Sequence, residues 1–433
     1  MKAWLEHHFH LKRRGTTVER EFMAGLTTFV TMLYIVPVNA AIMTQAGMPF
    51  EALVTATALV TVFASVLNGL WSNTPIAMSV GMGLNAYFTF GLVKGLGIPW
   101  ETALGVVFLS GALFMLLSFT PLRRWLVDSI PDDIRKAVTA GIGAFIAFIG
   151  LKQMGIIVAH PATLVGIGHL GDGQVLLGLF GLALTAVLMA RGAKGAFMIS
   201  ITVTALLGWV CGLANVPEHL FSLPASIAPI ALKLDLAGAC TLVMLPVIVT
   251  FLVTSLFDAV GTISGVASRA GMFTGKGSKE LKKTLEADAV CAAGSSLLGV
   301  STTTAFVESA TGVEEGGRTG LTAVFTGLLF LMPLFLLPVF QAVPPNAIYP
   351  VLVAVGGLMF SEIKHINLET PSAALPAFLI VLLMPLTFSI TYGLAAGILA
   401  AIVMMLAQGR WREINPALLL LGAISLVPFL LRH

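Results

Sequence analysis

Apolar stretches of roughly twenty residues recur from Phe22 to Ala407, with no soluble-type segment between them. A helix of about that length crosses the ~30 Å hydrocarbon core of a bilayer. Because lipid offers the backbone no hydrogen-bond partners, such a chain is restricted to helices or a closed barrel. Composition agrees: 57% of the 433 residues are hydrophobic and 10% are charged, against about 25% charged residues in a soluble domain. The sequence predicts an all-α polytopic membrane protein without an extramembrane catalytic module.

Apolar runs and turn residues divide the chain into about fourteen membrane segments. They cover residues 22–45, 52–71, 76–93, 102–120, 136–152, 174–190, 195–214, 239–264, 286–300, 301–316, 319–341, 346–361, 371–387 and 389–407. A last apolar run, 416–431, lies in the interface or crosses the membrane. The charged stretch before Phe22 lacks an apolar region and is not expected to be a cleavable signal peptide.

The basic residues predict the orientation. With a cytoplasmic N-terminus, most of the 24 Lys and Arg residues fall in loops on the cytoplasmic side. Only Lys94, Lys152 and Lys233 fall on the opposite side, and Arg432 follows the last apolar run. Cytoplasmic loops of membrane proteins carry such an excess of positive charge. We therefore expect a multi-pass protein of a bacterial-type inner or plasma membrane with its N-terminus in the cytoplasm.

Two carboxylates stand alone in apolar sequence. Asp258 is the only charged residue between Leu236 and Ser268, and Glu308 the only one between Ala289 and Val313. A charge at the bilayer centre costs about 2.5 to 3.5 kcal/mol on insertion scales, so an isolated one is normally retained for work on a ligand, ion or proton. The alternative for each is capping of the helical turn that follows it. The pattern favours an intramembrane binding site.

Two segments depart from plain helix, and both precede a short helical run. They are residues 79–85, rich in glycine, and residues 301–308, rich in threonine. Irregular backbone at membrane depth is tolerated only where protein or a cavity covers it, and half-helices often build transporter sites. At 1.5 Å per helical residue, Asn85 lies about 14 Å from Lys94, and Glu308 about 15 Å from Arg318. Both segments are predicted to break near the bilayer midplane.

An internal repeat supports this placement. Asn39 and Asn85 are separated by nearly the same stretch as Asp258 and Glu308, and the two pairs are offset by about 220 residues, close to half the chain. With an odd number of spans in each half, the second half must be inverted relative to the first. Inverted repeats with broken helices at the midplane are typical of secondary transporters. Asn39 and Asn85, the counterparts of the two acids, are neutral.

Further candidates surround the two acids. Asn85 and Asn39 offer amides that suit the edge of a heterocycle, although both also suit hydrogen bonds between helices. Thr304 and the threonines before it are candidate donors, or they simply favour an extended segment. Tyr87 and Phe306 are candidate stacking partners, or core residues. No metal site or cofactor is expected, because the three Cys lack C-x-x-C spacing. A His relay for protons through the membrane is not expected either, because the eight His lie in predicted loops or termini. If transport is proton-coupled, Asp258 or Glu308 must carry the proton.

At these residues the chain resembles the nucleobase/cation symporter-2 family, also called the nucleobase-ascorbate transporters, in its AzgA-like purine permease branch. The stretches that carry the resemblance are 24–29 (AGLTTF), 81–88 (GMGLNAYF), 256–262 (LFDAVGT), 304–309 (TAFVES) and 316–323 (GGRTGLTA). Within the branch, GLNAYF and TTTAFVES look most like guanine/hypoxanthine permeases. Two positions depart from the pattern: Glu314-Glu315 stands in place of small residues, and Ser79 in place of proline.

The resemblance implies two inverted seven-span repeats that form a core domain and a gate domain, with substrate bound between them. The expected division is a cytoplasmic N-terminus (1–21), core (22–120 and 239–345), gate (121–238 and 346–407) and a C-terminal segment, interfacial or cytoplasmic (408–433). In the family, residues matching Asp258, Glu308 and Asn85 contact the nucleobase. Members of this fold commonly dimerise, so a homodimer is expected, and nucleic acid is not.

The expected activity is proton-coupled import of purine nucleobases, with guanine and hypoxanthine favoured and adenine included, by an elevator-like movement of core against gate. Alternatives within transport are xanthine, uracil or an inorganic anion, and two acids at the site serve an anion poorly. A channel is a different class and would show a continuous polar stripe. An enzyme such as an intramembrane hydrolase would need an Asp pair or a nucleophile with a base, and neither is evident. The chain is therefore not expected to be an enzyme.

Overall fold

The computed structural model describes residues 2–120, 130–269, 279–411 and 414–430. In the first half the elements are α1 (Lys2–Phe9), α2 (Val18–Met32), α3 (Ile35–Thr44), α4 (Phe50–Ser72), β1 (Met78–Val80), α5 (Met82–Ala86), the π-helix η1 (Tyr87–Val93), α6 (Lys94–Leu96), α7 (Trp100–Ser118), α9 (Asp132–Gln153), β2 (Ile157–His160), β3 (Leu164–Ile167), α10 (Gly173–Ala190) and α11 (Ala196–Val210).

The second half runs through α12 (Leu236–Ala239), α13 (Leu245–Arg269), α14 (Lys279–Leu297), β4 (Thr303–Ala305), α15 (Ser309–Glu314), α16 (Gly320–Leu329), the 3₁₀-helix η2 (Met332–Phe335), α17 (Leu337–Ala342), α18 (Pro345–Phe360), the 3₁₀-helix η3 (Ser361–His365), α19 (Pro371–Thr387), α20 (Ile390–Ala407) and α21 (Pro416–Leu430). Among the described residues, eight helical stretches are long and apolar enough to cross a membrane. Four shorter apolar helices accompany them. The all-α polytopic prediction is confirmed.

Three predicted boundaries are wrong, each for a local reason. The segment placed at 286–300 is α14, which begins at Lys279, because its charged first turns escape a search for apolar residues. The segment placed at 239–264 begins at Leu245, since the short α12 precedes it. The segment placed at 319–341 divides into α16, η2 and α17. Pro333 and Pro338 lie where it divides, and proline removes a helical N–H donor.

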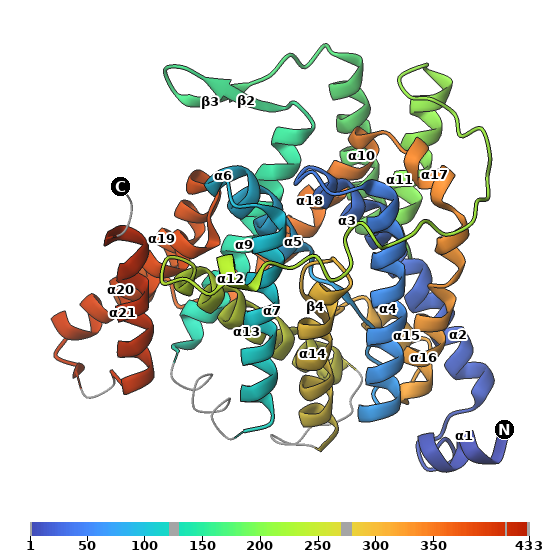
Figure 1. Ribbon diagram of the computed structural model, residues 1–433, viewed down its shortest axis with the longest axis horizontal. Coiled ribbons are helices and arrows are strands. Elements are labelled where there is room, and N and C mark those ends of the chain that lie inside the picture. The colour runs from blue at the N-terminus through green and yellow to red at the C-terminus, as the bar shows by residue number, and fades with distance from the viewer. Residues whose placement is uncertain (1, 121–129, 270–278, 412–413, 431–433) are drawn as a thin grey trace.

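The helices pack as two sets. The core set comprises α2, α3, α4, α7, α13, α14 and α16, and the gate set comprises α9, α10, α11, α18, α19 and α20. The sets meet where α3, α5 and α13 contact α18, α9 and α20. In Figure 1, α1 lies at one end of the molecule and the β2–β3 hairpin at the opposite end. Helices far apart in sequence, such as α4 and α16 or α9 and α18, pack side by side.

The long connection from α11 to α13 is fixed to the core set near its end. The backbone N–H of Asp235 donates to Glu101 O (2.9 Å) and its carboxylate accepts from Gly238 N (3.0 Å) and Thr102 Oγ1 (2.9 Å). These bonds, the Gly238 N–H first, hold the pKa of Asp235 below its usual value. The Asp235 cap on α12 therefore persists at neutral pH.

The crossing of α9 and α18 depends on a glycine contact. A Cβ on Gly356 would lie 2.8 Å from Ala147 N, whereas a Cβ on the neighbouring Gly357 would meet nothing within 4 Å. Overpacking a helix contact of this kind costs about 1 to 3 kcal/mol.

We predict that Gly356→Val lowers the thermal unfolding midpoint of the purified protein by several degrees, while Gly357→Val leaves it nearly unchanged. Both variants add valine to the same helix, so helix propensity cancels in the comparison. Fluorescence-detected thermal unfolding in detergent measures the difference. Equal midpoints for the two variants would contradict the close crossing.

Candidate functional site

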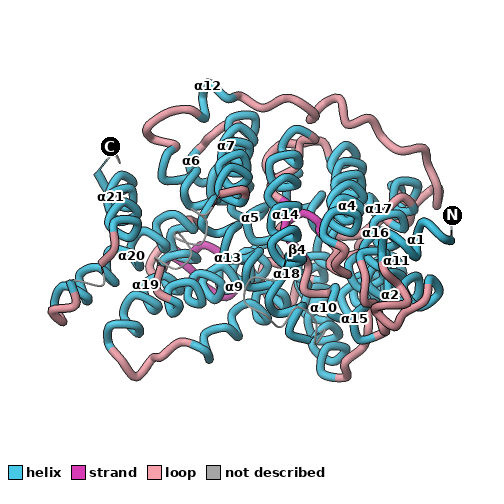
Figure 2. The backbone as a smooth tube through the Cα atoms, turned by 90° about the horizontal axis from the view of Figure 1, so that it is seen from below, coloured by secondary structure: helices cyan, strands magenta, loops and turns pink. Residues whose placement is uncertain are grey.

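The two predicted breaks meet inside the core set. β1 and β4 pair antiparallel with Ser79 opposite Thr304, and Figure 2 shows this strand pair surrounded by helices. The pairing continues beyond the strands through Gly81 N to Thr302 O (2.9 Å) and Phe306 N to Ala77 O (3.0 Å). The backbone groups that leave the helices are thereby satisfied without water, as a lipid environment demands.

The two lone carboxylates are brought to this strand pair. Glu308 lies three residues after β4, at the N-cap of α15, and Asp258 lies in α13. Both side chains are partly exposed. Their charges interact. The Thr304 hydroxyl lies close to the Asp258 carboxylate without reaching hydrogen-bond geometry. Tyr34 donates its hydroxyl proton to Glu308 Oε1 at 2.7 Å. Acids separated by fifty residues of sequence thus share one site.

Asn85 and Asn39 form a relay beside the strands. The Asn85 amide donates to Asn39 Oδ1, and Asn39 Nδ2 donates to Thr57 Oγ1 at 2.7 Å. Both asparagines are fully buried. Asn85 Oδ1 accepts no hydrogen bond from the described residues. Asn39 therefore makes hydrogen bonds between helices and fixes the orientation of the Asn85 amide. The Asn85 oxygen remains able to accept a hydrogen bond from a ligand.

The two candidate stacking residues are both buried. The Tyr87 ring centroid lies 5.5 Å from that of Phe251, and its hydroxyl shares a 2.6 Å hydrogen bond with Thr391 Oγ1 of α20. Tyr87 thus connects the core set to the gate set. Phe306 is 6% exposed and extends the strand pairing through its backbone. Stacking of either ring on a ligand stays a prediction.

A third carboxylate was missed by the sequence analysis. Asp288 of α14 is fully buried, and neither of its oxygens has a hydrogen-bond partner among the described residues. Its charge interacts with that of Asp258. The sequence pattern does not single it out, because Glu280, Lys282, Lys283 and Glu286 lie close before it and it is therefore not isolated in apolar sequence. Counting from the true helix start at Lys279 places Asp288 about 14 Å into α14.

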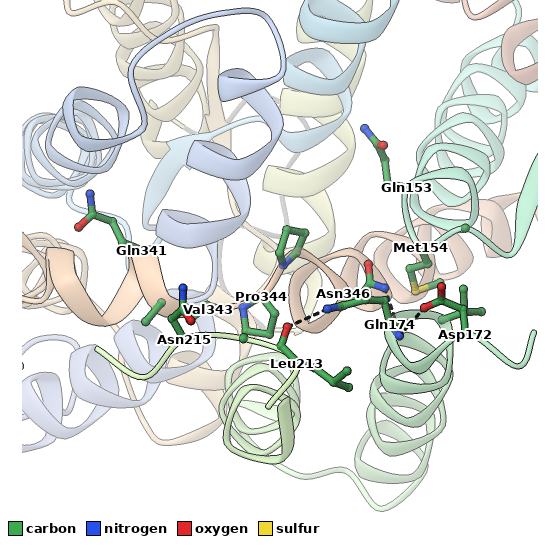
Figure 3. A pocket seen from close by; sticks show the side chains of 15 residues that line it. Gln153, Met154, Asp172, Gln174, Leu213, Asn215, Gln341, Val343, Pro344 and Asn346 are labelled. Carbon is green, nitrogen blue, oxygen red and sulfur yellow. Dashed lines mark hydrogen bonds between the residues drawn. The ribbon is translucent and has the colours of Figure 1, made fainter. Parts of the chain in front are cut away.

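A separate cavity of about 640 Å³ lies elsewhere, between α9, α10, α17 and α18. Figure 3 shows Gln153, Gln174, Asn215, Gln341 and Asn346 around it. Its only carboxylate is that of Asp172, which caps α10 through Gln174 N at 2.7 Å. The cavity holds none of the predicted site residues.

Comparison with known proteins decides the family. The model of the Permease family, Xan_ur_permease, matches residues 19–396. The chain belongs to this family. Its members are permeases and not enzymes, which confirms the prediction of a transporter of the nucleobase-ascorbate type.

Relatives match over nearly their whole length. The chain is 44% identical to the putative permease MJ0326 of Methanocaldococcus jannaschii, over 98% of both chains. It is 40% identical to the adenine permease AdeP of Escherichia coli, covering 98% of this chain and 96% of AdeP. It is 38% identical to the guanine/hypoxanthine permease PbuO of Bacillus subtilis, covering 97% and 99%.

Solved structures share the fold. The transmembrane domain of the cyanobacterial bicarbonate transporter BicA aligns with a TM-score of 0.65 at 16% identity, covering 88% of this chain and 97% of BicA. Murine Slc26a9, an anion transporter in the inward-facing state, aligns with a TM-score of 0.66 at 12% identity, covering 90% and 68%. The predicted fold of inverted repeats with core and gate domains is confirmed.

Two buried carboxylates with opposite surroundings offer a test of the site. Glu21 is as buried as Asp288, but it accepts from Arg318 N (2.9 Å), Thr319 N (3.2 Å), and Thr322 N (3.2 Å) and Oγ1 (2.6 Å) at the start of α16. Glu21 is compensated, whereas Asp288 either buries an unpaired charge or holds a proton, and both cost free energy at neutral pH.

We therefore predict that Asp288→Asn raises the thermal unfolding midpoint of the protein at pH 7 by a few degrees. Glu21→Gln is expected to lower the midpoint, because an amide nitrogen cannot accept the bonds that a carboxylate oxygen accepts. Unfolding scans of both variants beside the wild type give the answer. A loss of stability in Asp288→Asn equal to that in Glu21→Gln would contradict the uncompensated burial of Asp288.

Proposed function

We propose that this chain is a proton-coupled importer of purine nucleobases in the cytoplasmic membrane. The observation that carries the proposal is the packing of α13 against β4 and α15 beside the β1–β4 pair, which places Asp258 and Glu308, fifty residues apart in sequence, in one partly exposed site. Relatives named as adenine permeases and as guanine/hypoxanthine permeases, matched over nearly the full chain, support the substrate class. Guanine and hypoxanthine are the favoured substrates, and adenine is included.

The chemistry of the site suits a purine edge. An ionised Glu308 accepts two hydrogen bonds from adjacent N–H groups, as N1 and N2 of guanine offer, or one from N1 of hypoxanthine. The Asn85 oxygen is a second acceptor. An inorganic anion, by contrast, would be repelled by Asp258 and Glu308. Xanthine and uracil remain the nucleobase alternatives, and a channel is not favoured.

Proton coupling is supported by the crowding of acids. The Asp258 charge interacts with those of Glu308 and Asp288. Carboxylates that lie close together disfavour one another's ionised form, so we expect one of these acids to carry a proton. We assign the coupling to Asp258 or Glu308, with Asp288 behind them. A proton entering with a neutral purine changes the charge of the site and drives accumulation.

The proposed movement is an elevator-like displacement of the core against the gate. The packing of the described helices into two sets supports a division into core 22–120 with 239–345 and gate 121–238 with 346–407. The N-terminal segment 1–21 is assigned to the cytoplasm by the bias of Lys and Arg, and 408–433 to the interface or the cytoplasm. A homodimer in the lipid bilayer is the proposed assembly.

The test is uptake of radiolabelled hypoxanthine, guanine, adenine and uracil into proteoliposomes, with and without an inward proton gradient and an uncoupler. We expect purine accumulation that the uncoupler abolishes. Asp258→Asn is expected to lose accumulation while purine binding to purified protein stays measurable, and Glu218→Gln, at an exposed position, should transport like the wild type. Absence of uptake for all four bases would contradict the nucleobase assignment, and uptake unaffected by the uncoupler would contradict the coupling.

A further inference from the structure

Tyr34 lies at a break in the first membrane segment. α2 ends at Met32 and α3 begins at Ile35, so Tyr34 falls in the interruption. Its side chain is 1% exposed. The sequence analysis did not single it out, since a tyrosine inside an apolar run usually packs in the core. Its two ends, however, contact different parts of the transporter.

The hydroxyl end contacts the binding site. Tyr34 Oη donates to Glu308 Oε1 at 2.7 Å, across 274 positions of sequence. A hydrogen bond to an ionised carboxylate is about twice as strong as a neutral one. It also fixes the rotation of the carboxylate, and therefore the direction in which Glu308 presents its oxygens to a ligand.

The ring end contacts the gate set. The ring centroid of Tyr34 lies 4.9 Å from that of Phe197 in α11, at an interplanar angle of 68°. Such edge-to-face pairs contribute about 0.5 to 1.5 kcal/mol beyond area burial. Phe197 is 9% exposed, so the contact is well packed.

The contact belongs to a continuous seam between the two helix sets. Beside Phe197, the gate residue Gly195 packs so closely that a Cβ there would lie 3.1 Å from Val30 Cγ1. Lys194 forms an ion pair with Glu315 of the core set, one of the two acids that depart from the family pattern. Residues 194–197 therefore touch the core set at several points around Tyr34, and these contacts must change when core moves against gate.

We propose that Tyr34 is a positioning residue that links Glu308, the carboxylate proposed to bind the substrate, to gate helix α11. The inference rests on the proposed function and deepens it. With the Tyr34 ring held by Phe197, the hydroxyl orients Glu308 to receive the N–H edge of a purine. When the core moves, the ring contact is lost and the hydrogen bond loses its support, so binding geometry and domain position change together.

A purely structural tyrosine makes a different prediction. If Tyr34 only fills space, Tyr34→Phe keeps the ring against Phe197 and changes nothing in purine binding. If the hydroxyl orients Glu308, Tyr34→Phe weakens binding although the fold is intact. Tyr349 provides the matched control. It is buried, and its hydroxyl forms no hydrogen bond with residues 2–120, 130–269, 279–411 or 414–430.

The experiment measures equilibrium binding of the purine that the wild type transports fastest, together with initial uptake rates in proteoliposomes. We expect Tyr34→Phe to weaken binding about tenfold, as for a lost hydrogen bond to a charged group. Tyr349→Phe should bind within twofold of wild type, and unfolding midpoints of the variants confirm that each is folded.

Phe197→Leu tests the gate end. It should weaken purine binding, by less than Tyr34→Phe does because leucine still packs against the Tyr34 ring, and it should lower the maximal uptake rate severalfold. In the double variant Tyr34→Phe/Phe197→Leu the rate losses should combine to less than their product. If the wild type transports purines and Tyr34→Phe binds and takes them up equally well, this inference is overturned while the proposed function stands. Strictly multiplicative rate losses would overturn the linkage. Absence of purine transport in the wild type itself would overturn the proposed function and this inference with it.

Discussion

The antiparallel pairing of β1 with β4 is the contact on which the rest of the structure depends. Three residues from each half of the chain exchange backbone hydrogen bonds where a membrane supplies no other partners. The two strands interrupt helices that would otherwise run unbroken past the site. Because the strands come from opposite halves and run antiparallel, the pairing is also the point at which the inverted repeats meet. Every candidate ligand contact lies on or beside it.

The site built on this pairing is asymmetric. The first half contributes neutral groups, with Asn39 orienting Asn85, whereas the second half contributes Asp258, Asp288 and Glu308. Burial makes each added charge expensive, which is the physical basis of the proposed coupling between ligand binding and protonation. Glu21, by contrast, is a buried acid whose oxygens accept several hydrogen bonds. Among the described residues, Asp288 is the fully buried acid whose oxygens accept none, and its helix α14 packs against β4.

Much of this arrangement was predictable from the sequence. Asp258 and Glu308 were identified because a bilayer penalises isolated charges that have no function. Both strands were located from glycine-rich or β-branched breaks, because a bilayer also penalises irregular backbone that protein does not cover. Asp288 was missed because other charged residues precede it closely in sequence, and the start of α14 at Lys279 shows its depth in the helix. Tyr34 was missed because a tyrosine carries no signal of its partner 274 positions away. Contacts across the inverted repeat are set by tertiary packing, which local patterns do not encode.

The paired strands and the carboxylates beside them form the proposed purine site between core and gate. A cryo-electron microscopy structure with the transported purine bound would locate the base. We expect its density against Glu308 and Asp258, beside the β1–β4 pair, with an N–H edge toward the Glu308 oxygens. Density confined to the cavity lined by Gln174 and Asn346, with both carboxylates untouched, would contradict it.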